Sequence, residues 1–512
     1  MTEAGTRTEP SPAGFRASLM FWRRWSWLQP RSMLWPRWIW LRALGLIFLS
    51  AFYSLAFQIR GLNGPRGILP AGEYLHELGS AVGLAEALWA APTLFWIGAS
   101  NAALMTVTLA GVAASVLLVF NVAPRASIAI AGICFLSFVA AAQDFSSYQS
   151  DGMLLEAAFI SVFVAPRGLR PRLGADDPPS RLAIFLLVWE WFRIYFESGV
   201  VKILSGDPQW RSLTAMDHYY ENGPLPSWIG WYVQQRLPHW FHQLTAASTF
   251  VFELAVVWLA LLPRRFRIAC FFLVSPFQAV IILTANYAFL NYIVLCLGVF
   301  LLDDRFLRLA TPEPPPARAS WPARIALGWI LYATIVIAPG IAHWLPRPLL
   351  WPAIALEPLR IANRYGLFAV MTKERYEIEF QGSRDGISWT PYPFRYKPQD
   401  PMRAPGIYAP YQPRFEWNLW FASLGHWREY PWVVRTELRL FEGAPDVLQL
   451  FAADPFEGRP PAYVRAVRWQ YWFTTAEEKR ATGAWWKREE RGLYAPTLHV
   501  GVDGIDLVGR PP

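Results

Sequence analysis

The sequence predicts a polytopic α-helical membrane bundle of about nine spans, followed by an all-β or α+β extracytoplasmic C-terminal domain. Only 17% of the 512 residues are charged, 54% are hydrophobic, and the mean hydropathy is +0.22. A soluble protein carries about 25% charged residues, so this chain has too few charges for a large water-facing surface. Long apolar runs continue to about residue 344, and beyond residue 375 the pattern changes to alternating apolar and polar residues.

The first predicted region, residues 1–38, is an Arg- and Trp-rich cytoplasmic segment. Its run FWRRWSWLQPRSMLWPRWIW (21–40) lacks the small-residue cleavage site of a signal peptide. Alternating indoles and arginines suit the membrane interface, where an aromatic ring and a headgroup partner are both available. We therefore expect this segment to lie against the bilayer surface.

The second predicted region, residues 39–344, is the transmembrane bundle. A span needs roughly 20 apolar residues. Nine runs span or nearly span by this measure: 39–57, 102–121, 126–142, 153–166, 182–203, 243–262, 268–283, 285–302 and 324–344. The run 153–166 is short, so it is either re-entrant or lies in a thinned part of the bilayer. The segment 84–99 contains Glu86 and Pro92 and is taken as interfacial.

The distribution of arginine predicts the orientation of the bundle. With nine spans, eighteen arginines lie in the loops on the N-terminal side and four on the opposite side. Cytoplasmic loops are enriched in Lys and Arg, so the N-terminus is predicted inside and the C-terminus outside. Counting 84–99 as a span would instead place the sequence RRFR (264–267) outside. The outer face then carries the polar loops 143–152 and 204–242.

The third predicted region, residues 345–512, is a β-rich domain with helical insertions. YEIEF (376–380) alternates like a half-buried strand, the turn sequence QGSRDG (381–386) follows it, and ISWTPYPFRY completes a predicted hairpin. VRAVRWQYWF (464–473) has the β-branched and aromatic residues of a strand. Residues 432–441 and 446–453 are predicted to be short amphipathic helices. At about 165 residues, this region is large enough for a core of its own.

Composition also excludes several classes of function. The three cysteines, Cys134, Cys270 and Cys296, lie in apolar runs and form no CxxC pair. This pattern excludes a disulfide framework, a zinc knuckle and a thioredoxin-type redox centre. The net charge of +9 does not by itself indicate a nucleic-acid partner, because excess arginine in membrane proteins marks cytoplasmic loops. We expect no metal, no cofactor and no nucleic acid.

Charged residues inside apolar runs mark candidate functional positions, because each costs about 2.5–3.5 kcal/mol on insertion scales. In QDFSSYQSDGMLLEAAF (143–159), Asp144, Gln149 and Asp151 lie at the predicted outer mouth of the bundle, and Glu156 falls inside the apolar run. Glu156 is either a functional carboxylate or the partner of an arginine or a helix terminus, and both interpretations stay open.

The run LAIFLLVWEWFRIYFESGVVKILSGD (182–207) carries four more charged residues in a predicted span. Glu190, Arg193 and Glu197 are spaced three and four residues apart, so they share one helix face and we expect an ion-pair network. Lys202 lies near the end of the run. It is either a desolvated base or a lysine whose ammonium reaches the interface.

The long outer loop SGDPQWRSLTAMDHYYENGPLPSWIGWY (205–232) is predicted to fold as a cap over the bundle. Its Asp217, His218 and Glu221 could form an acid/base or metal cluster. A histidine beside two tyrosines is more often a hydrogen-bonded packing residue, and we favour that interpretation. Further along, Asn286 and Asn291 enter the membrane near the outer face, and their amides are expected to bond to the loops above.

Taken together, these motifs resemble those of the lipase maturation factor family. The resemblance rests on the 151–156 loop, SGDPxWRxLTAM (205–216), ENGPLP (221–226), NYxFxN (286–291), LLDD (301–304), NRYGLFAVMTKERYEIEFQGSRDGISW (363–389), FRYKP (394–398), APYQPRFEWNLWFASLG (409–425) and DPFEGRPPAYVRA (454–466). The matches run in order over residues 140–475. One departure is HYYENGP (218–224), where the family often has Tyr-His-Tyr-Glu-Thr-Gln-Pro, so the histidine is displaced by one position.

The resemblance implies an integral membrane maturation factor that assists the folding and assembly of secreted proteins, with lipases as expected clients and membrane lipid as the other partner. It implies the endoplasmic reticulum membrane for eukaryotic relatives. The Arg-, Ala-, Trp- and Pro-rich composition is typical of a high-GC bacterium, hence of a bacterial inner membrane. The matched motifs add seven candidate residues: Asp207, Trp210, Arg211, Arg364, Tyr365, Arg414 and Trp417.

The chain shows no recognisable catalytic set, so a protein that is not an enzyme is favoured. The alternative is a membrane enzyme, because Ser198, Gly199 and Lys202 resemble part of the vitamin K-dependent carboxylase-like membrane domain. Lys202, Glu156 and His218 would then be catalytic candidates in an outward-facing pocket. Convergence of Lys202, Glu156 and Asn286 on one cavity would favour the enzyme. Lys202 bound to a carboxylate and closed off by residues 205–226 would favour the maturation factor.

Overall fold

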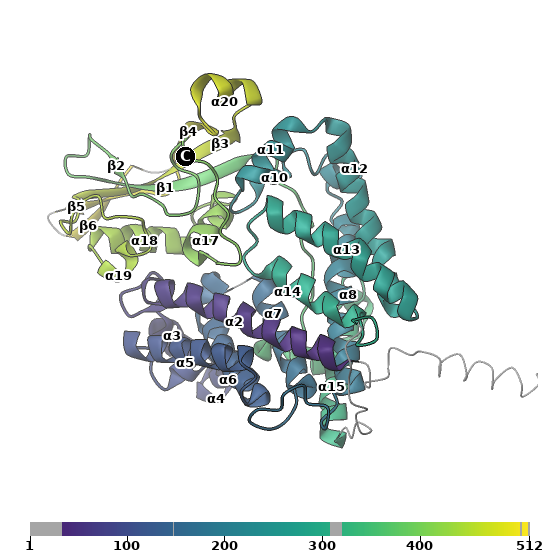
Figure 1. Cartoon of the computed structure of the whole chain (residues 1–512). Coiled ribbons are helices and arrows are strands. Elements are labelled where there is room, and N and C mark those ends of the chain that lie inside the picture. Colours follow the sequence, from purple (N-terminus) through teal and green to yellow (C-terminus); the bar gives the residue numbers. More distant parts are fainter. Residues whose placement is uncertain (1–32, 147, 308–319, 502–503, 510–512) are drawn as a thin grey trace, which may run out of the picture.

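The computed structural model describes residues 33–146, 148–307, 320–501 and 504–509. The Arg- and Trp-rich segment predicted at 1–38 therefore lies outside the described residues up to residue 32. From Leu34 to Val336 the described chain is mainly helical, and a sheet with its own helices follows after residue 375 (Figure 1). This division matches the predicted order of an apolar helical region followed by a β-containing region.

Five helices of the described chain are long and apolar enough to cross a membrane. They are α2 (Leu34–Asn63), α5 (Asn101–Val119), α6 (Pro124–Ala141), the continuous helix His239–Leu261 that begins with α12 (His239–Phe250), and α13 (Arg264–Thr284). The other predicted runs are also helical but are shorter or carry more charge. They form α7 (Gln149–Val164), α8 (Arg181–Leu204), α14 (Leu290–Leu297) with the 3₁₀ turn Gly298–Leu301, and α15 (Trp321–Val336). The count of nine spans therefore stays a prediction.

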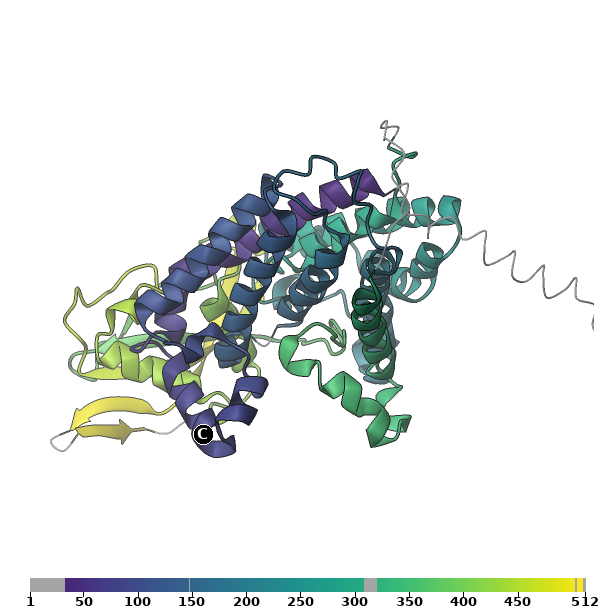
Figure 2. The ribbon, with the colours of Figure 1, turned by 90° about the horizontal axis from the view of Figure 1, so that it is seen from below.

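The bundle has two groups of helices. Helices α2, α5 and α6 lie side by side, and α12, α13 and α15 lie at the other end of the molecule, with α7 and α8 between them (Figures 1 and 2). Asp304 of the LLDD run accepts the backbone N–H groups of Leu34 (3.0 Å) and Trp35 (2.7 Å) and so caps α2. Asp303 pairs with Arg264 in the RRFR run, at 2.5 Å between Oδ2 and Nε.

The segment 84–99 contains no helix of membrane-spanning length. It follows α3 (Ala71–Val82) and consists of the seven-residue helix α4 (Leu84–Ala90) and a 3₁₀ turn at Leu94–Trp96. Leu84, Trp89 and Ile97 are exposed, the last to 90%. Such exposed apolar side chains on short helices agree with an interfacial position. The later helix α16 (Arg347–Ile354) likewise exposes Leu349 and Trp351.

The C-terminal region is an α+β unit with a six-stranded antiparallel sheet. The strand order is β2-β1-β3-β5-β6, and β4 also pairs with β3. The strands are β1 (Arg375–Ser383), β2 (Thr390–Pro391), β3 (Tyr463–Phe473), β4 (Trp486–Leu493), β5 (Thr497–Gly501) and β6 (Gly504–Val508). The helices are α17 (Arg414–Ser423), α18 (Pro431–Phe441), α19 (Pro445–Leu448) and α20 (Ala476–Thr482). The predicted hairpin is β1–β2, and the predicted strand at 464–473 is β3.

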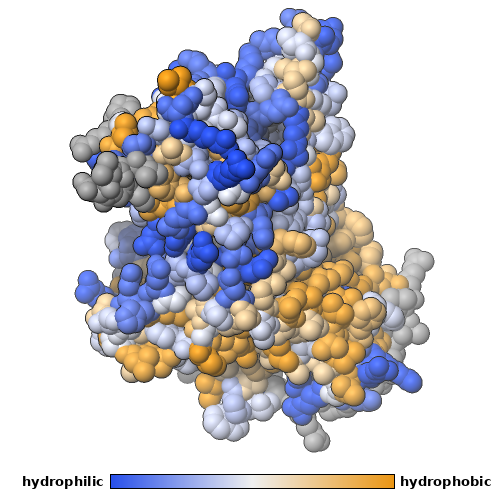
Figure 3. All heavy atoms as spheres, turned by 90° about the vertical axis from the view of Figure 1, so that its left-hand side faces the viewer, coloured by the Kyte–Doolittle hydropathy of each residue, from blue (hydrophilic) through white to orange (hydrophobic). Residues whose placement is uncertain are grey.

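The surface of the molecule separates the two regions chemically. On the face shown in Figure 3, hydrophobic side chains gather over the lower part, where the bundle lies, and hydrophilic side chains cover the C-terminal region above. An apolar belt on one region with a polar surface on the other is expected for a protein with one part in the bilayer and one in water. Between bundle and sheet, the polar loop 204–242, which we call the outer loop after its predicted side, forms the short helices α9 (Pro208–Arg211), α10 (Tyr219–Asn222) and α11 (Trp228–Arg236).

Candidate functional site

The candidate site is the contact between the helical bundle and an irregular stretch of backbone, residues 360–372, which we call the junction segment. It lies between the 3₁₀ turn Glu357–Leu359, which follows α16, and strand β1, and it contains neither helix nor strand. Irregular backbone carries N–H and C=O groups that no regular structure satisfies, and burying one without a partner costs free energy. Within a membrane, such backbone is tolerated only where it is buried in protein or lines a water-filled cavity. The question is therefore which side chains supply those bonds.

Helices α7 and α8 supply them for the first half of the junction segment. Glu156 Oε2 accepts the N–H of Asn363 (3.0 Å), and Arg193 donates to the C=O of Asn363 (2.7 Å). Glu197 accepts the N–H of Tyr365 at 2.8 Å. Three further contacts continue the series: Gln149 with Gly366 N–H (2.9 Å), Ser198 Oγ with Leu367 N–H (3.2 Å) and Lys202 Nζ with Leu367 C=O (3.0 Å). Two of the three catalytic candidates, Glu156 and Lys202, thus bind backbone.

The outer loop supplies partners for the second half. Four loop side chains donate to C=O groups of the junction segment: Trp210 to Phe368 (2.9 Å), Ser205 to Ala369 (2.7 Å), Gln209 to Met371 (2.6 Å) and Asn222 to Thr372 (2.8 Å). A fifth loop side chain, Asp207, accepts the N–H of Met371 (2.6 Å). Asp207 also accepts the Gln209 N–H (2.9 Å), which caps the short helix α9. The loop motif SGDPQW is therefore a set of backbone-binding groups.

A second segment, residues 405–414, which is irregular up to the first residue of α17, is bound in the same way. Asn286 accepts the N–H groups of Tyr408 (2.7 Å) and Ala409 (3.1 Å) and donates to the C=O of Gly406 (3.0 Å). Its amide also donates to the C=O groups of Leu225 and Pro226 in the outer loop. At the end of this segment, Arg414 forms a two-bond pair with Asp151 of α7, at 2.8 and 2.7 Å. Both members of that pair are buried, and Arg414 also donates to the C=O of Phe145 (2.8 Å).

A buried charge cluster lies beneath the junction segment. Arg193 on α8 pairs closely with Glu156 on α7 and lies 3.8 Å from Glu197 one turn along its own helix. Tyr365 donates from its hydroxyl to Glu156 (2.9 Å) and lies 3.4 Å from Glu190. A single arginine therefore pairs with two carboxylates, while the third, Glu190, contacts Tyr365; all three carboxylates are at most 3% exposed. Gly152 leaves room for Asn363, because a Cβ atom there would lie 2.7 Å from the amide oxygen.

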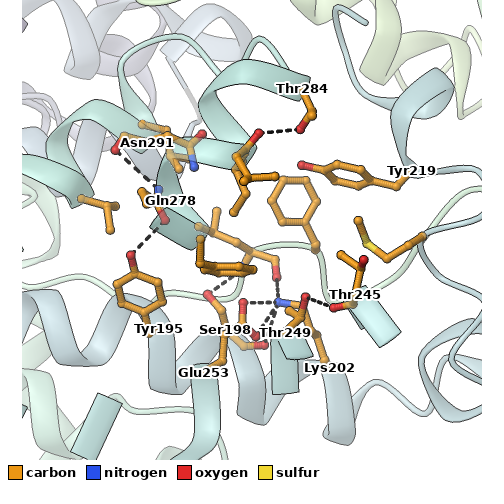
Figure 4. Close-up of a pocket in the computed structure, with 18 of the residues that line it drawn as sticks. Tyr195, Ser198, Lys202, Tyr219, Thr245, Thr249, Glu253, Gln278, Thr284 and Asn291 are labelled. Atoms are coloured by element: carbon orange, nitrogen blue, oxygen red, sulfur yellow. Dashed lines mark hydrogen bonds and ion pairs between the residues drawn. The ribbon is translucent and has the colours of Figure 1, made fainter. Parts of the chain in front are cut away.

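Lys202 lies at one wall of a pocket between α8, α12, α13 and α14 (Figure 4). Its Nζ is 2.9 and 3.0 Å from the two carboxylate oxygens of Glu253. Glu253 belongs to a π-helical turn, Val251–Ala255, which interrupts the helix His239–Leu261. Gly199 permits the close approach of that turn, because a Cβ atom there would lie 2.7 Å from Leu254 and 3.0 Å from Glu253. Residues Trp210, Met216, Tyr219 and Tyr220 of the outer loop form another wall.

A second hollow, the aromatic groove, lies between the bundle mouth, the junction segment and α17. It has a volume of about 1260 Å³. Its aromatic lining residues are Tyr148, Tyr287, Phe368, Trp417, Trp420, Phe421, Tyr430 and Trp432. Val370 is 67% exposed and Phe421 is 38% exposed at this groove. The groove therefore offers aromatic and aliphatic surface at the boundary between the apolar bundle and the polar domain.

The predicted cluster of Asp217, His218 and Glu221 does not assemble as one group. His218 Nδ1 lies 3.2 Å from Glu221, whereas Asp217 lies 3.0 Å from His239. The hydrogen bond to Glu221 raises the pKa of His218. Glu221 also accepts the N–H of Phe473 at the end of β3 (3.0 Å). His218 is thus a packing partner of a residue that connects the outer loop to the sheet.

The residues proposed for an enzyme do not converge. Lys202 lines the pocket of Figure 4, but Glu156 and Asn286 do not, and they bind the two irregular segments instead. Lys202 is paired with a carboxylate and covered by residues of the 205–226 loop, which is the arrangement that favours the maturation factor. Asn291 is buried beside this pocket, and Trp417 stacks near Tyr148 in the groove. Asp144, Arg211 and Arg364 are exposed.

Comparison with known families agrees with this geometry. The lipase maturation factor transmembrane domain matches residues 35–309, and the lipase maturation factor C-terminal domain matches residues 361–496. The chain belongs to the lipase maturation factor family. With its apolar helices, it is a multi-pass membrane protein. The second matched domain begins in the junction segment, so the backbone that the bundle binds is also the start of the C-terminal domain.

Several animal relatives align with nearly the whole chain. Identity is 31% to lipase maturation factor 2 of Gallus gallus, over 90% of this chain and 81% of that protein. It is 31% to lipase maturation factor 2 of Homo sapiens, over 92% and 83% respectively. It is 32% to lipase maturation factor 1 of Mus musculus, over 90% and 86%. No solved structure matches the chain. These relatives lend no support to a carboxylase.

Sequence reasoning missed three important residues of the site. Glu253, the partner of Lys202, is the single carboxylate of the run 243–262 and could have been found as the complement of a lone lysine in a neighbouring span. Asn363 bridges Glu156 and Gly152 through its side chain, at 3.2 and 3.0 Å. Arg375 donates to the C=O groups of Glu221 and Gly223. Neither residue stands out in its own stretch of sequence, because most of the groups that each one binds lie more than 150 residues away along the chain.

Proposed function

We propose that this protein is an integral membrane maturation factor that assists the folding and assembly of secreted proteins, with lipases as its clients. The names of its relatives support the choice of client. The observation that carries the proposal is that the buried polar residues are used to fix the C-terminal domain to the bundle, which leaves an aromatic groove open at their boundary. A fixed groove of this kind suits binding rather than bond-making chemistry.

We place the client in the aromatic groove. Interfaces bind most strongly through Trp and Tyr side chains in well-packed hollows, and the groove is lined by both. Its position beside the junction segment lets an incomplete secreted protein meet apolar side chains at the bilayer boundary. The expected occupant is an apolar, extended part of the client that becomes buried once the client has folded. Asp144 and Gln149 lie at one end of this groove.

We further propose nine membrane segments, with the N-terminus in the cytoplasm and the C-terminal domain outside it. The arginine distribution supports this orientation, with eighteen on the inner and four on the outer side. If only the five longest apolar helices of the described chain crossed the membrane, the two ends would still lie on opposite sides, because five is also an odd number. In eukaryotic cells the outer side corresponds to the lumen of the endoplasmic reticulum, and in bacteria to the periplasmic face of the inner membrane. A cytoplasmic reporter fused after residue 512 should be silent.

The groove assignment is tested by secretion of an active lipase from cells that carry this protein as their only maturation factor. Phe421→Ser and Val370→Ser together remove exposed apolar surface from the groove. Ile387→Ser is the matched control, because Ile387 is 83% exposed in the β1–β2 turn and does not line the groove. At equal membrane levels, the groove variant should lose secreted lipase activity and the control should keep it. Equal activity of both variants would contradict the assignment.

A further inference from the structure

The pocket of Figure 4 has no role in the proposed binding of a client. Its hollow, with the open space at its mouth included, amounts to about 820 Å³. It is lined by α8, α12, α13 and α14 and is separated from the aromatic groove by a wall that both share, Leu290, Leu367 and Phe368. The Tyr219 ring points into it from the side opposite Tyr195 (Figure 4).

The polar side chains around this pocket are largely engaged within the protein. Ser198, Thr245, Thr249 and Thr284 each donate to the C=O four residues earlier in their own helices, at 2.6–3.0 Å. Gln278 accepts from the Tyr195 hydroxyl at 2.9 Å. Hydroxyls that bond to their own helix present their carbon atoms to the space beside them. The surface offered to an occupant is therefore mainly hydrocarbon.

The charges of the pocket disfavour an anionic group beside Lys202. Among the residues that line it, all of which the structure describes, Lys202 is the only cation, and Glu253 neutralises it at 2.9 Å. A free carboxylate or phosphate would need an unpaired cation or a set of free donors. An alkyl chain needs neither. The inner part of the pocket thus suits the end of a hydrocarbon chain, and a charged headgroup would have to remain elsewhere.

The pocket adjoins the surface that meets lipid. Thr245 and Thr249 lie on one candidate membrane helix, and Val280 and Ile281 lie on another, α13. Val280 is 54% exposed, as are Val251 and Leu283 on the same two helices, and Leu244 is 56% exposed. Exposed apolar side chains on membrane-crossing helices face acyl chains. A chain can therefore reach the pocket from the bilayer at its α13 rim.

We propose that this pocket binds one acyl chain of a membrane phospholipid, with the headgroup left at the outer interface. The π turn at Val251–Ala255 supports the assignment, since π turns inside α-helices occur frequently at functional sites. Here the turn directs Glu253 to Lys202, which keeps that end of the pocket neutral and open. We assign the chain to a phospholipid rather than to a free fatty acid, because phospholipid acyl chains are what a bilayer places against the exposed apolar side chains beside the pocket.

The test uses the full-length protein in lipid nanodiscs that contain a phosphatidylcholine with a diazirine at the end of one acyl chain. After illumination, mass spectrometry locates the labelled residues. The expected result is labelling of pocket residues that are buried, such as Ile194, Ser198 or Tyr219. Labelling confined to exposed residues of α12 and α13 would show only the surrounding bilayer and would overturn the proposal.

Variants that fill the pocket provide the second arm. Thr249→Trp should abolish labelling of the buried residues, whereas Leu244→Trp, on the exposed face of the same helix, should leave it unchanged. Thr245→Trp replaces a half-buried lining residue and serves if Thr249→Trp lowers the melting temperature. Unchanged labelling in the pocket-filling variant that folds would contradict the proposal. So would displacement of the phospholipid label by equimolar palmitate, because that result would assign the pocket to a free fatty acid.

Discussion

The junction segment and the two hollows beside it use polar residues in opposite ways. In the junction, side chains from α7, α8 and the outer loop reach across to the backbone of another part of the chain, as Glu156 does to Asn363 and Glu197 does to Tyr365. In the pocket, hydroxyls such as Thr249 bond to their own helix. Charged side chains of α7 and α8 therefore mark the places where the bundle binds the junction backbone. The two hollows beside the junction are lined mainly by apolar and aromatic side chains.

This difference explains why charged residues in the apolar runs, such as Glu156 and Lys202, do not mark a catalytic site. Ionisable residues in spans are expensive and are kept for a purpose, but that purpose includes structural binding. Here the purpose of Glu156, Arg193 and Glu197 is to satisfy irregular backbone that would otherwise be unsatisfied near the membrane. The consequence is a C-terminal domain that is fixed to the bundle at two segments, 360–372 and 405–414.

We expect the largest loss of stability when Arg193, which binds both Glu156 and the junction segment, is replaced. Arg193→Leu leaves Glu156 without its cation among two other carboxylates, which should cost on the order of 3–5 kcal/mol of stability. Arg172→Leu is the control, because Arg172 is exposed in the loop between α7 and α8 and its loss should change stability by less than about 0.5 kcal/mol. Melting temperatures in detergent compare the two. Equal melting temperatures of the two variants would contradict the claim that the buried charge cluster stabilises the junction.

A smaller effect is expected on the pocket side of α8. Gly199→Ala places a Cβ atom 2.7 Å from the Leu254 side chain and 3.0 Å from Cβ of Glu253, so the packing between α8 and the π turn must adjust. Overpacking of this kind costs about 1–3 kcal/mol. Gly132→Ala is a suitable control, because the space beside Gly132 is open. A melting temperature as high in Gly199→Ala as in Gly132→Ala would show that α8 and the π turn are not tightly packed.

Protonation of Glu416 should make the stability of the C-terminal domain depend on pH. Burial raises the pKa of this carboxyl to about 6, although it accepts the N–H groups of residues 395, 396 and 397. A carboxyl with a higher pKa in the folded state binds more protons when folded, so its contribution to stability falls as pH rises from about 4.5 to 6. The total change is roughly 2 kcal/mol.

Glu416→Gln should therefore show a smaller loss of melting temperature than the unmodified protein between pH 4.5 and 6.5. Glu429→Gln changes an exposed carboxyl in the same domain and should follow the unmodified protein. Parallel curves for all three proteins would mean that Glu416 does not titrate in this range.

Much of the architecture follows from the sequence, because it depends on local patterns. The apolar runs coincide with helices, the alternating run 376–380 lies in β1, and residues 432–441 form most of α18. Helix α20 was missed although Thr475 and Glu478 form a capping box, a signal that sequence can show. The site was harder to predict, because many of its polar residues bind groups more than 100 residues away along the chain, as Glu197 binds the N–H of Tyr365.

The contacts also change one expectation about independence of the domains. The length of residues 345–512 indicates a domain able to form its own core, and its sheet and helices do pack around residues such as Phe380, Phe415 and Phe451. Removing it, however, would leave Asp151 and Glu197 of the bundle without Arg414 and the Tyr365 N–H. Unpaired buried charges are strongly destabilising. Point substitutions are therefore better tests of function than truncation.

The central claim, that the junction is a fixed support rather than a moving or reacting part, is tested most directly by locking it. A Cβ atom at Gly366 would lie 3.8 Å from Cβ of Val201, a separation suited to a disulfide. The double variant Val201→Cys and Gly366→Cys should form this bridge, with closure measured by loss of thiol labelling relative to each single variant. If the claim holds, the bridged protein supports secretion of active lipase as well as either single variant at equal membrane levels. Loss of lipase activity in the bridged protein alone would show that the junction must move, and would contradict the account.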